Sequence, residues 1–429
     1  MKLPSTLFLT VLLLSAAVTS HAQSSEANYE STRPRLVAAA KSAKTKSQEP
    51  ASSQSQPRSQ EPPPKPATIP IVPDSSRATV REDSNRRLTP SRLRLRIAEA
   101  ERLMKARPML TAMTPSLEYV TIAALLSETS QIHLIRVSKQ TFLTRNAEIS
   151  GISTLGLPVH LRVLRANGVN TALAIFDDQN RSLIPLAVEF PIERRGTFNE
   201  MAYYTSAHPA LLSPDLTKTG QTYVNSMVDL AAKRLRERGN PIAADLIDVA
   251  KRLCIVEHVD HERFRNENRI ALFDEIYSLY ALNELETYRY SVSSAGAGGM
   301  VQMIPWTYAL MRSRHPGVGL NPDFVAGMRN HGNALEAMLL YMQDTWNDLL
   351  ASEDVQGAIT AKQATPAEIM AAGYNSNAAR IPGYIRRGGA AWRTLIPRET
   401  QIYLQIYQSL DVLMKAKENH ARKNQKPDR

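Results

Sequence analysis

Two kinds of hydrophobic periodicity divide this chain, and one uniform architecture cannot satisfy both. Between about residues 115 and 195 the apolar residues fall in short runs rich in β-branched side chains, which predict strands. The runs lie at 118–126, 131–137, 159–165, 171–177 and 182–190. Hairpin-type turn residues separate the later runs, at 167–168 and 177–180. This part predicts a small antiparallel β-rich domain, either a sandwich or a barrel.

The period changes to that of amphipathic helices beyond residue 217. A shorter basic helix over 91–107, with Ser91 as its N-cap, is expected to lead into the β-rich domain. The predicted fold class is therefore α+β, with a C-terminal all-α domain behind the small β-rich one. The longer helices are expected at 218–237, 241–256, 262–284, 305–314, 333–350, 366–373 and 398–414.

The N-terminal part predicts export followed by a spacer. Lys2, an apolar stretch at 7–18 and small residues up to Ala22 predict a signal peptide over 1–22, cleaved after Ala22. Residues 23–90 are rich in Pro, Ser and Gln and are expected to be disordered, because they cannot bury enough apolar area to offset the entropy of ordering. This linker is either a passive spacer or a tether to a fixed polymer. The expected location is the periplasm or cell envelope.

The folded domains are then expected over 91–216, for the β-rich domain with its leading helix, and over 217–414, for the helical domain. A basic, disordered tail is expected over 415–429. After signal cleavage, no segment has the roughly 20 apolar residues that a membrane span needs. A monomer is expected.

The distribution of charge argues against a nucleic-acid partner. The chain has 52 Lys and Arg against 41 Asp and Glu, a formal charge of +11. Residues 23–110 carry +8, residues 415–429 carry +4 and Lys2 carries +1, which leaves −2 for 111–414. The basic excess thus lies outside the predicted folded body. A single cysteine, Cys254, excludes both an internal disulfide framework and a Cys-cluster zinc site, since each needs at least two thiols.

Small residues gather between two predicted helices, in the stretch ELETYRYSVSSAGAGGMVQMIPWT over 284–307. Residues 295–299 have little or no side chain and permit close approach to a bound polymer. Gln302 follows, with an amide that both donates and accepts hydrogen bonds and suits hydroxyl and acetamido groups. The glycines alone would also fit a loop that binds nothing.

Three blocks in this order resemble the signature of the soluble lytic transglycosylases, within the lysozyme-like superfamily. Glu284 precedes the glycine–alanine pair at 296–297 by twelve residues, without a gap, and the phrases GMVQ and PWT follow. GYNSN at 373–377 resembles the tyrosine–asparagine block of that family, and PRETQIY at 397–403 resembles its Pro-x-Glu-Thr-x-x-Tyr block. The resemblance covers roughly 250–412 and implies a lysozyme-like fold for the helical domain.

The resemblance implies cleavage of the MurNAc-β-1,4-GlcNAc bond of peptidoglycan with formation of 1,6-anhydromuramoyl ends. Glu284 would act as general acid and then as base, and no cofactor or metal is implied. The implied partner is the glycan strand. The implied substrate-binding residues are Met300, Gln302, Tyr374, Asn375 and Glu399, although Glu399 is equally suited to the start of the last helix.

The residues around Glu284 support its assignment as the acid. Tyr277 and Tyr280 lie seven and four residues before it on the same helix face, and a position at the helix C-terminus disfavours a carboxylate. Both effects favour a neutral acid. Glu286 is the rival carboxyl, but a continuing helix would point it elsewhere.

Departures from the family pattern leave two alternatives open. Leu285 stands where the family has serine, Val301 where it has methionine and Asn377 where it has glycine. A binding or scaffold protein without turnover, or a hydrolysing lysozyme on the same fold, is therefore also possible. The cluster EHVDH at 257–261 holds four potential metal ligands, but its spacing differs from that of metallopeptidase helices, and we interpret it as capping and surface charge.

Overall fold

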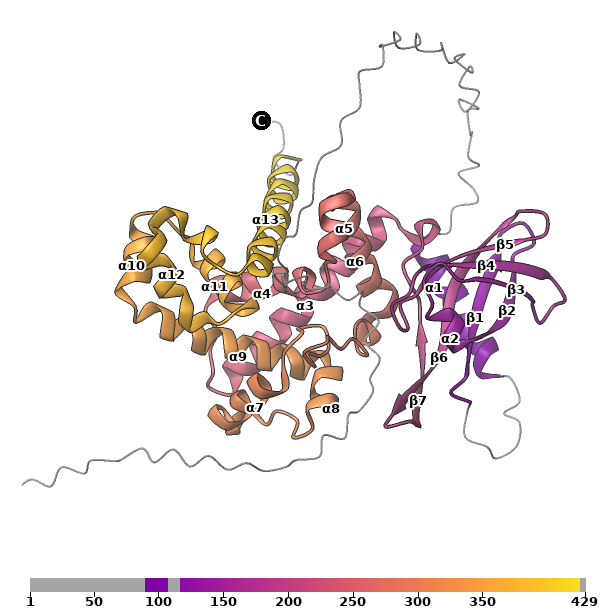
Figure 1. Cartoon of the computed structure of the whole chain (residues 1–429), viewed down its shortest axis with the longest axis horizontal. Coiled ribbons are helices and arrows are strands. Elements are labelled where there is room, and N and C mark those ends of the chain that lie inside the picture. The colour runs from indigo at the N-terminus through magenta and orange to yellow at the C-terminus, as the bar shows by residue number, and fades with distance from the viewer. Residues whose placement is uncertain (1–88, 107–115, 425–429) are drawn as a thin grey trace, which may run out of the picture.

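The computed structural model describes residues 89–106 and 116–424, with side chains to residue 416, and it confirms the α+β class. A curved sheet forms one end of the molecule and a helical body forms the other, with the last helix, α13, projecting from it (Figure 1). The predicted signal peptide and nearly all of the predicted linker lie outside the described residues. α13 continues past the predicted boundary at 414 as far as Asn424.

The sheet has seven antiparallel strands in the order β2-β1-β6-β5-β4-β3, with β7 paired to β6. After β3, the backbone N–H of Thr154 donates to the Leu134 carbonyl of β2, so the two ends of this order approach each other and the sheet curls into a half-barrel. Register shifts in β1 and β6 add local twist. The strands are β1 (Tyr119–Leu126), β2 (Gln131–Ser138), β3 (Glu148–Ile152), β4 (Pro158–Arg165), β5 (Ala172–Asp177), β6 (Ser182–Arg194) and β7 (Thr197–Tyr204).

The five predicted strand runs are confirmed, whereas β3 and β7 were not predicted. Neither sequence alternates cleanly, because β3 contains Gly151 and β7 begins with the mixed run TFNE. The predicted turn chemistry is also confirmed. Gly168 and Asn180 both adopt positive φ, and Asp177 accepts hydrogen bonds from the backbone of Gln179 and Arg181.

Both faces of the central strands are buried, which explains why β1 reads as a continuous apolar run. Helix α1 (Pro90–Lys105) packs Leu93 and Ile97 on one face, and Phe142 of the short helix α2 (Lys139–Phe142) fills the other. The prediction that Ser91 caps the first helix is wrong. Thr89 is the cap, because Pro90 occupies the first helical position and places the hydroxyl of Thr89 opposite the Arg92 backbone N–H.

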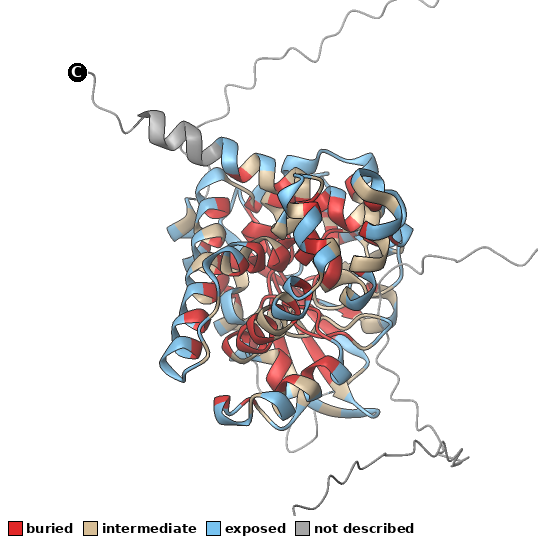
Figure 2. Cartoon of the chain, turned by 90° about the vertical axis from the view of Figure 1, so that its left-hand side faces the viewer, coloured by how far each residue is buried: buried red, intermediate tan, exposed pale blue. Residues whose placement is uncertain are grey.

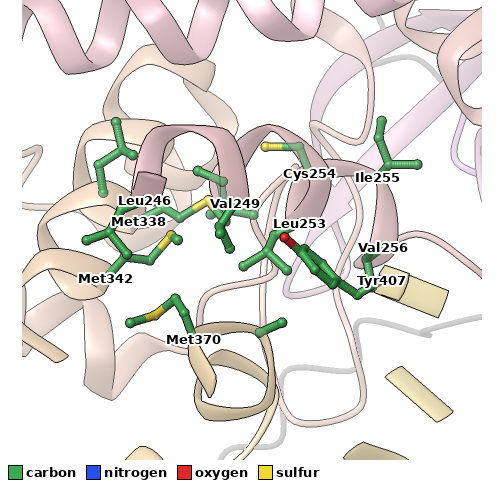
Figure 3. Packing of buried hydrophobic residues seen from close by; sticks show 14 of the residues in the cluster. Leu246, Val249, Leu253, Cys254, Ile255, Val256, Met338, Met342, Met370 and Tyr407 are labelled. Carbon is green, nitrogen blue, oxygen red and sulfur yellow. The ribbon is translucent and has the colours of Figure 1, made fainter. Parts of the chain in front are cut away.

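The helical region surrounds a core that is rich in methionine (Figure 3), and its buried residues gather in the interior of the molecule (Figure 2). The predicted helix over 262–284 is two helices, because Asn268 caps a new one. The helices are α3 (Pro214–Glu237), α4 (Ala244–Val256), α5 (His261–Asn266), α6 (Arg269–Asn283), α7 (Pro305–Arg314), α8 (Phe324–Arg329), α9 (His331–Leu350), α10 (Glu353–Thr360), α11 (Pro366–Asn375), α12 (Ile381–Gly388) and α13 (Arg398–Asn424).

Helix α6 joins the sheet to the helical region. The side-chain amide of Asn283 donates to the Thr205 carbonyl at 2.9 Å, and its oxygen accepts from the Thr205 N–H at 2.8 Å. Leu279 on the same helix is part of the core of the sheet. The residues that follow α6, from 284 to 303, therefore run along the junction between the two parts.

Candidate functional site

Three blocks of the sequence come together at the end of α4: the glycine-rich segment up to 307, GYNSN at 373–377 and PRETQIY at 397–403. The helix ends at Val256, and the next residue, Glu257, is its half-buried C-cap. The hydroxyl of Tyr403 in α13 donates a hydrogen bond to Glu257 Oε1 at 2.6 Å. Tyr374 of α11 lies close enough for the charge of the same carboxylate to raise the pKa of its hydroxyl. The tyrosines of the second and third blocks thus meet at Glu257.

The first block, which contains Met300 and Val301, contacts the same site through its backbone carbonyls. His258 donates from Nε2 to the Met300 carbonyl at 3.0 Å, and Tyr374 donates its hydroxyl to the Val301 carbonyl at 2.7 Å. The imidazole of His258 also stacks on the ring of Tyr288, with 3.4 Å between ring centroids. The turn at 299–302 is therefore held against both Glu257–His258 and Tyr374.

Close packing explains at least one glycine of this turn. Gly299 has φ +67°, and a Cβ there would lie 2.3 Å from the Met328 carbonyl oxygen at the end of α8. Only glycine permits that approach without moving the backbone. The need for glycine at position 299 is thus explained by its contact with Met328 of this chain, without a bound polymer.

The two tyrosines remain protonated donors over the ordinary pH range. Burial raises the pKa of the Tyr374 hydroxyl well above its usual range, and the negative charge of Glu257 raises it further. The pKa of Tyr403 is raised by the same two causes, burial first. The Tyr403 hydroxyl therefore stays a hydrogen-bond donor that holds the Glu257 carboxyl in place.

Two of the predicted substrate-binding residues are buried. Met300 is fully enclosed in the core of the helical region, and its side chain is not exposed. The side chain of Gln302 donates from Nε2 to the Gly299 carbonyl at 2.8 Å and to Ser291 Oγ at 3.2 Å. Gln302 therefore braces the turn from inside.

The other predicted residues lie nearer the surface. Asn375 is half-buried at the end of α11, directly after Tyr374. Glu399 is exposed in the first turn of α13, where the helix dipole favours a carboxylate. This position fits a structural role at the start of the last helix. Trp306, in the first turn of α7, is 70% exposed and offers a flat apolar ring close to the turn at 299–302.

Glu284 lies at the surface, away from Tyr374 and Tyr403. It is the exposed C-cap of α6, with φ +47°, and it borders a pocket of about 440 Å³ along α3 that Lys218 and Tyr223 also line. The pKa of Tyr223 is raised by burial and then by the charge of Glu284, whereas Tyr374 and Tyr403 face Glu257. Tyr280, which the sequence placed on the same helix face, also lines this pocket, but Glu284 itself is exposed. Its rival Glu286 pairs with Arg289 at 3.0 Å.

Glu257 was missed by the sequence reasoning because an ungapped spacing of twelve residues selected Glu284. A signal was present: the predicted helix over 241–256 also ends directly before a carboxylate. Helices α5 and α6 lie between Glu257 and the glycine turn, so a comparison that allowed an inserted helical segment would have kept Glu257 as a candidate. The interpretation of 257–261 as capping holds for Asp260, whose side chain accepts from the Glu262 and Arg263 backbone.

Comparisons with family models, with curated proteins and with solved structures give no match. In the part of the chain that the structure describes, no three His, Cys, Asp or Glu residues are grouped as a metal site would require. Among the helices in those same ranges, none combines the length and the apolar character needed to cross a membrane.

Proposed function

We propose that this protein is a peptidoglycan lytic transglycosylase, with Glu257 as its acid–base residue and Glu284 as the second candidate. The observation that carries the proposal is the convergence of the three blocks on Glu257 and His258. Tyr403, Tyr374 and the Met300 carbonyl belong to separate blocks, and each lies beside this pair.

The proposed reaction uses one carboxyl for two proton transfers. Glu257 in its neutral form donates its proton to the glycosidic oxygen as the bond from C1 of the muramic acid breaks. The resulting carboxylate then takes the proton of the C6 hydroxyl while that oxygen bonds to C1, which restores the acid and leaves a 1,6-anhydro ring. Ordinary glycosidases need a second carboxylate. Here the substrate's own hydroxyl replaces it, and Tyr403 orients the carboxyl.

The surroundings of the site fit a glycan better than a charged polymer. The region from 111 to 414 carries a formal charge of −2, so it has little attraction for a phosphate backbone. The exposed indole of Trp306 offers a surface on which a sugar ring can stack. In this proposal the protein is exported.

Digestion of purified sacculi tests the proposal, because the product ends identify the reaction. Anhydromuramoyl ends support a transglycosylase, reducing ends support a lysozyme-type hydrolase, and binding without release supports a scaffold protein. Glu257→Gln and Glu284→Gln form a matched pair, since each replaces one carboxylate by its amide. We expect Glu257→Gln to abolish release, with loss of at least about a hundredfold in rate, and Glu284→Gln to retain most of it.

The reverse result would return the catalytic role to Glu284. Because Glu284 is exposed, its amide variant should fold normally, and circular dichroism of both variants controls for unfolding. Full activity in both variants would show that neither glutamate is the acid–base residue.

A further inference from the structure

One carboxylate of the sheet accepts hydrogen bonds from three side chains of the helical region. Glu200, on β7, accepts from Arg289 Nη2 at 3.3 Å and from the Tyr290 hydroxyl at 3.2 Å, both through Oε2. Its Oε1 accepts from Arg329 at the end of α8. β7 thereby ties the segment after α6 to the end of α8, across the junction of the two parts.

We infer that Glu200 is a positioning residue for the candidate site, and that the β-rich domain serves as a brace for the segment that carries the first block. The expected effect of Glu200 on activity rests on the proposed function. The expected bracing of the segment rests only on the contacts of Glu200.

The residues that Glu200 holds lie between two residues that touch the site. Before Arg289 stands Tyr288, whose ring stacks on His258, the neighbour of Glu257. After Tyr290 stands Ser291, whose carbonyl accepts from the Gly299 backbone N–H at 3.0 Å and whose hydroxyl accepts from Gln302. Fixing 289 and 290 thus fixes both Tyr288 and the edge of the turn at 299–302.

The electrostatic setting makes Glu200 difficult to replace. The Arg329 side chain is only 15% exposed, so loss of Glu200 leaves a largely buried guanidinium with its contact to the Tyr290 ring but without this counter-ion. Arg289 keeps Glu286 as a partner, but its Nε is buried and has no hydrogen-bond acceptor within the described residues. Without Glu200, we expect both arginines to turn toward solvent and the chain at 288–291 to loosen.

Small displacements here matter because catalysis depends on the position of the reacting groups. A shift of about 1 Å in an active site costs on the order of a hundredfold in rate. Glu200 lies on β7 and reaches Glu257 only through Tyr288 and His258. Its loss should therefore lower the turnover rate more than it weakens binding of the glycan.

The test compares Glu200→Gln with Glu193→Gln in the full chain. Both changes remove one carboxylate from the β6–β7 hairpin, but Glu193 is paired with Lys139 at 3.6 Å, within the β-rich domain. Hydrogen–deuterium exchange is measured for the backbone amides of Gly298 and Gly299. Both are bonded in the native turn, to the Met303 and Ser291 carbonyls. We expect these amides to exchange at least tenfold faster in Glu200→Gln than in the wild-type protein, and at an unchanged rate in Glu193→Gln. The amides of α4 and α9 should stay protected in both variants.

On sacculi, we expect kcat of Glu200→Gln to fall about tenfold or more with KM changed less than twofold. Unchanged exchange at the two glycines in Glu200→Gln would overturn the inference, whatever the activity. A fall in activity that appears only as a higher KM would also overturn it, since it would place Glu200 in binding. If the wild-type protein releases nothing from sacculi, the proposed function fails, but the exchange measurement still decides whether Glu200 holds the segment.

Discussion

The packing of α3 on α6 leads to a prediction in which local and tertiary effects have opposite signs. Gly220 lies inside the long helix α3, where alanine is normally favoured over glycine by about 1 kcal/mol. A Cβ at Gly220 would, however, lie 1.7 Å from the carbonyl oxygen of Tyr277 in α6, and 2.6 Å from the carbonyl carbon. The obstacle is backbone, so no side chain can rotate to make room.

The size of the effect follows from that overlap. Ordinary contact begins near 3.4 Å, so α6 would have to move by well over 1 Å relative to α3. Overpacking of a close-packed interior costs about 1–3 kcal/mol, and displacement of backbone belongs at the upper end. After subtraction of the gain in helix propensity, we expect Gly220→Ala to lower the free energy of unfolding by about 2 kcal/mol.

The matched control is Gly357→Ala in α10, because no atom lies within 4 Å of a Cβ at Gly357. Only the local effect acts there, so this variant should be stabilised by about 0.5–1 kcal/mol. Urea denaturation of both variants gives the two free energies. Cys254 supplies a second probe, since its thiol is fully buried and reacts with a thiol reagent only when the core opens. Equal or greater stability of Gly220→Ala would refute the close contact between α3 and α6.

Two further predictions concern buried polar groups. Burial lowers the pKa of His331 from its usual 6.5 to about 4, so below pH 6.5 the unfolded chain binds a proton that the folded chain does not. The free energy of unfolding should fall by about 2–3 kcal/mol between pH 7.5 and 4.5, and an NMR titration of His331 near pH 6.5 would contradict this. Tyr403→Phe removes the 2.6 Å hydrogen bond to Glu257 and should slow release from sacculi about tenfold or more, whereas an unchanged rate would show that the bond has no part in catalysis.

Glu257 and Glu284 illustrate why fold and site differ in how far they can be predicted. Each follows a predicted apolar helix, so periodicity and helix position do not distinguish them. The spacing to the glycine turn favoured Glu284, but spacing along the chain is a poor guide to distance when two helices, α5 and α6, fold back between Glu257 and the turn. Met300 and Gln302 were likewise in a recognisable block, yet they support the turn from inside the core.

Patterns in the amino-acid sequence were sufficient to predict the α+β class of the fold. The strand runs, the turn at Gly168 and the helical period beyond residue 217 act locally, through backbone preferences and the burial of one face. Tertiary structure alone decided which carboxylate meets Tyr374 and Tyr403, and that Glu200 of the sheet holds the segment beside them. These contacts join residues that are far apart in the chain, and their geometry depends on how whole helices pack, which no local pattern encodes.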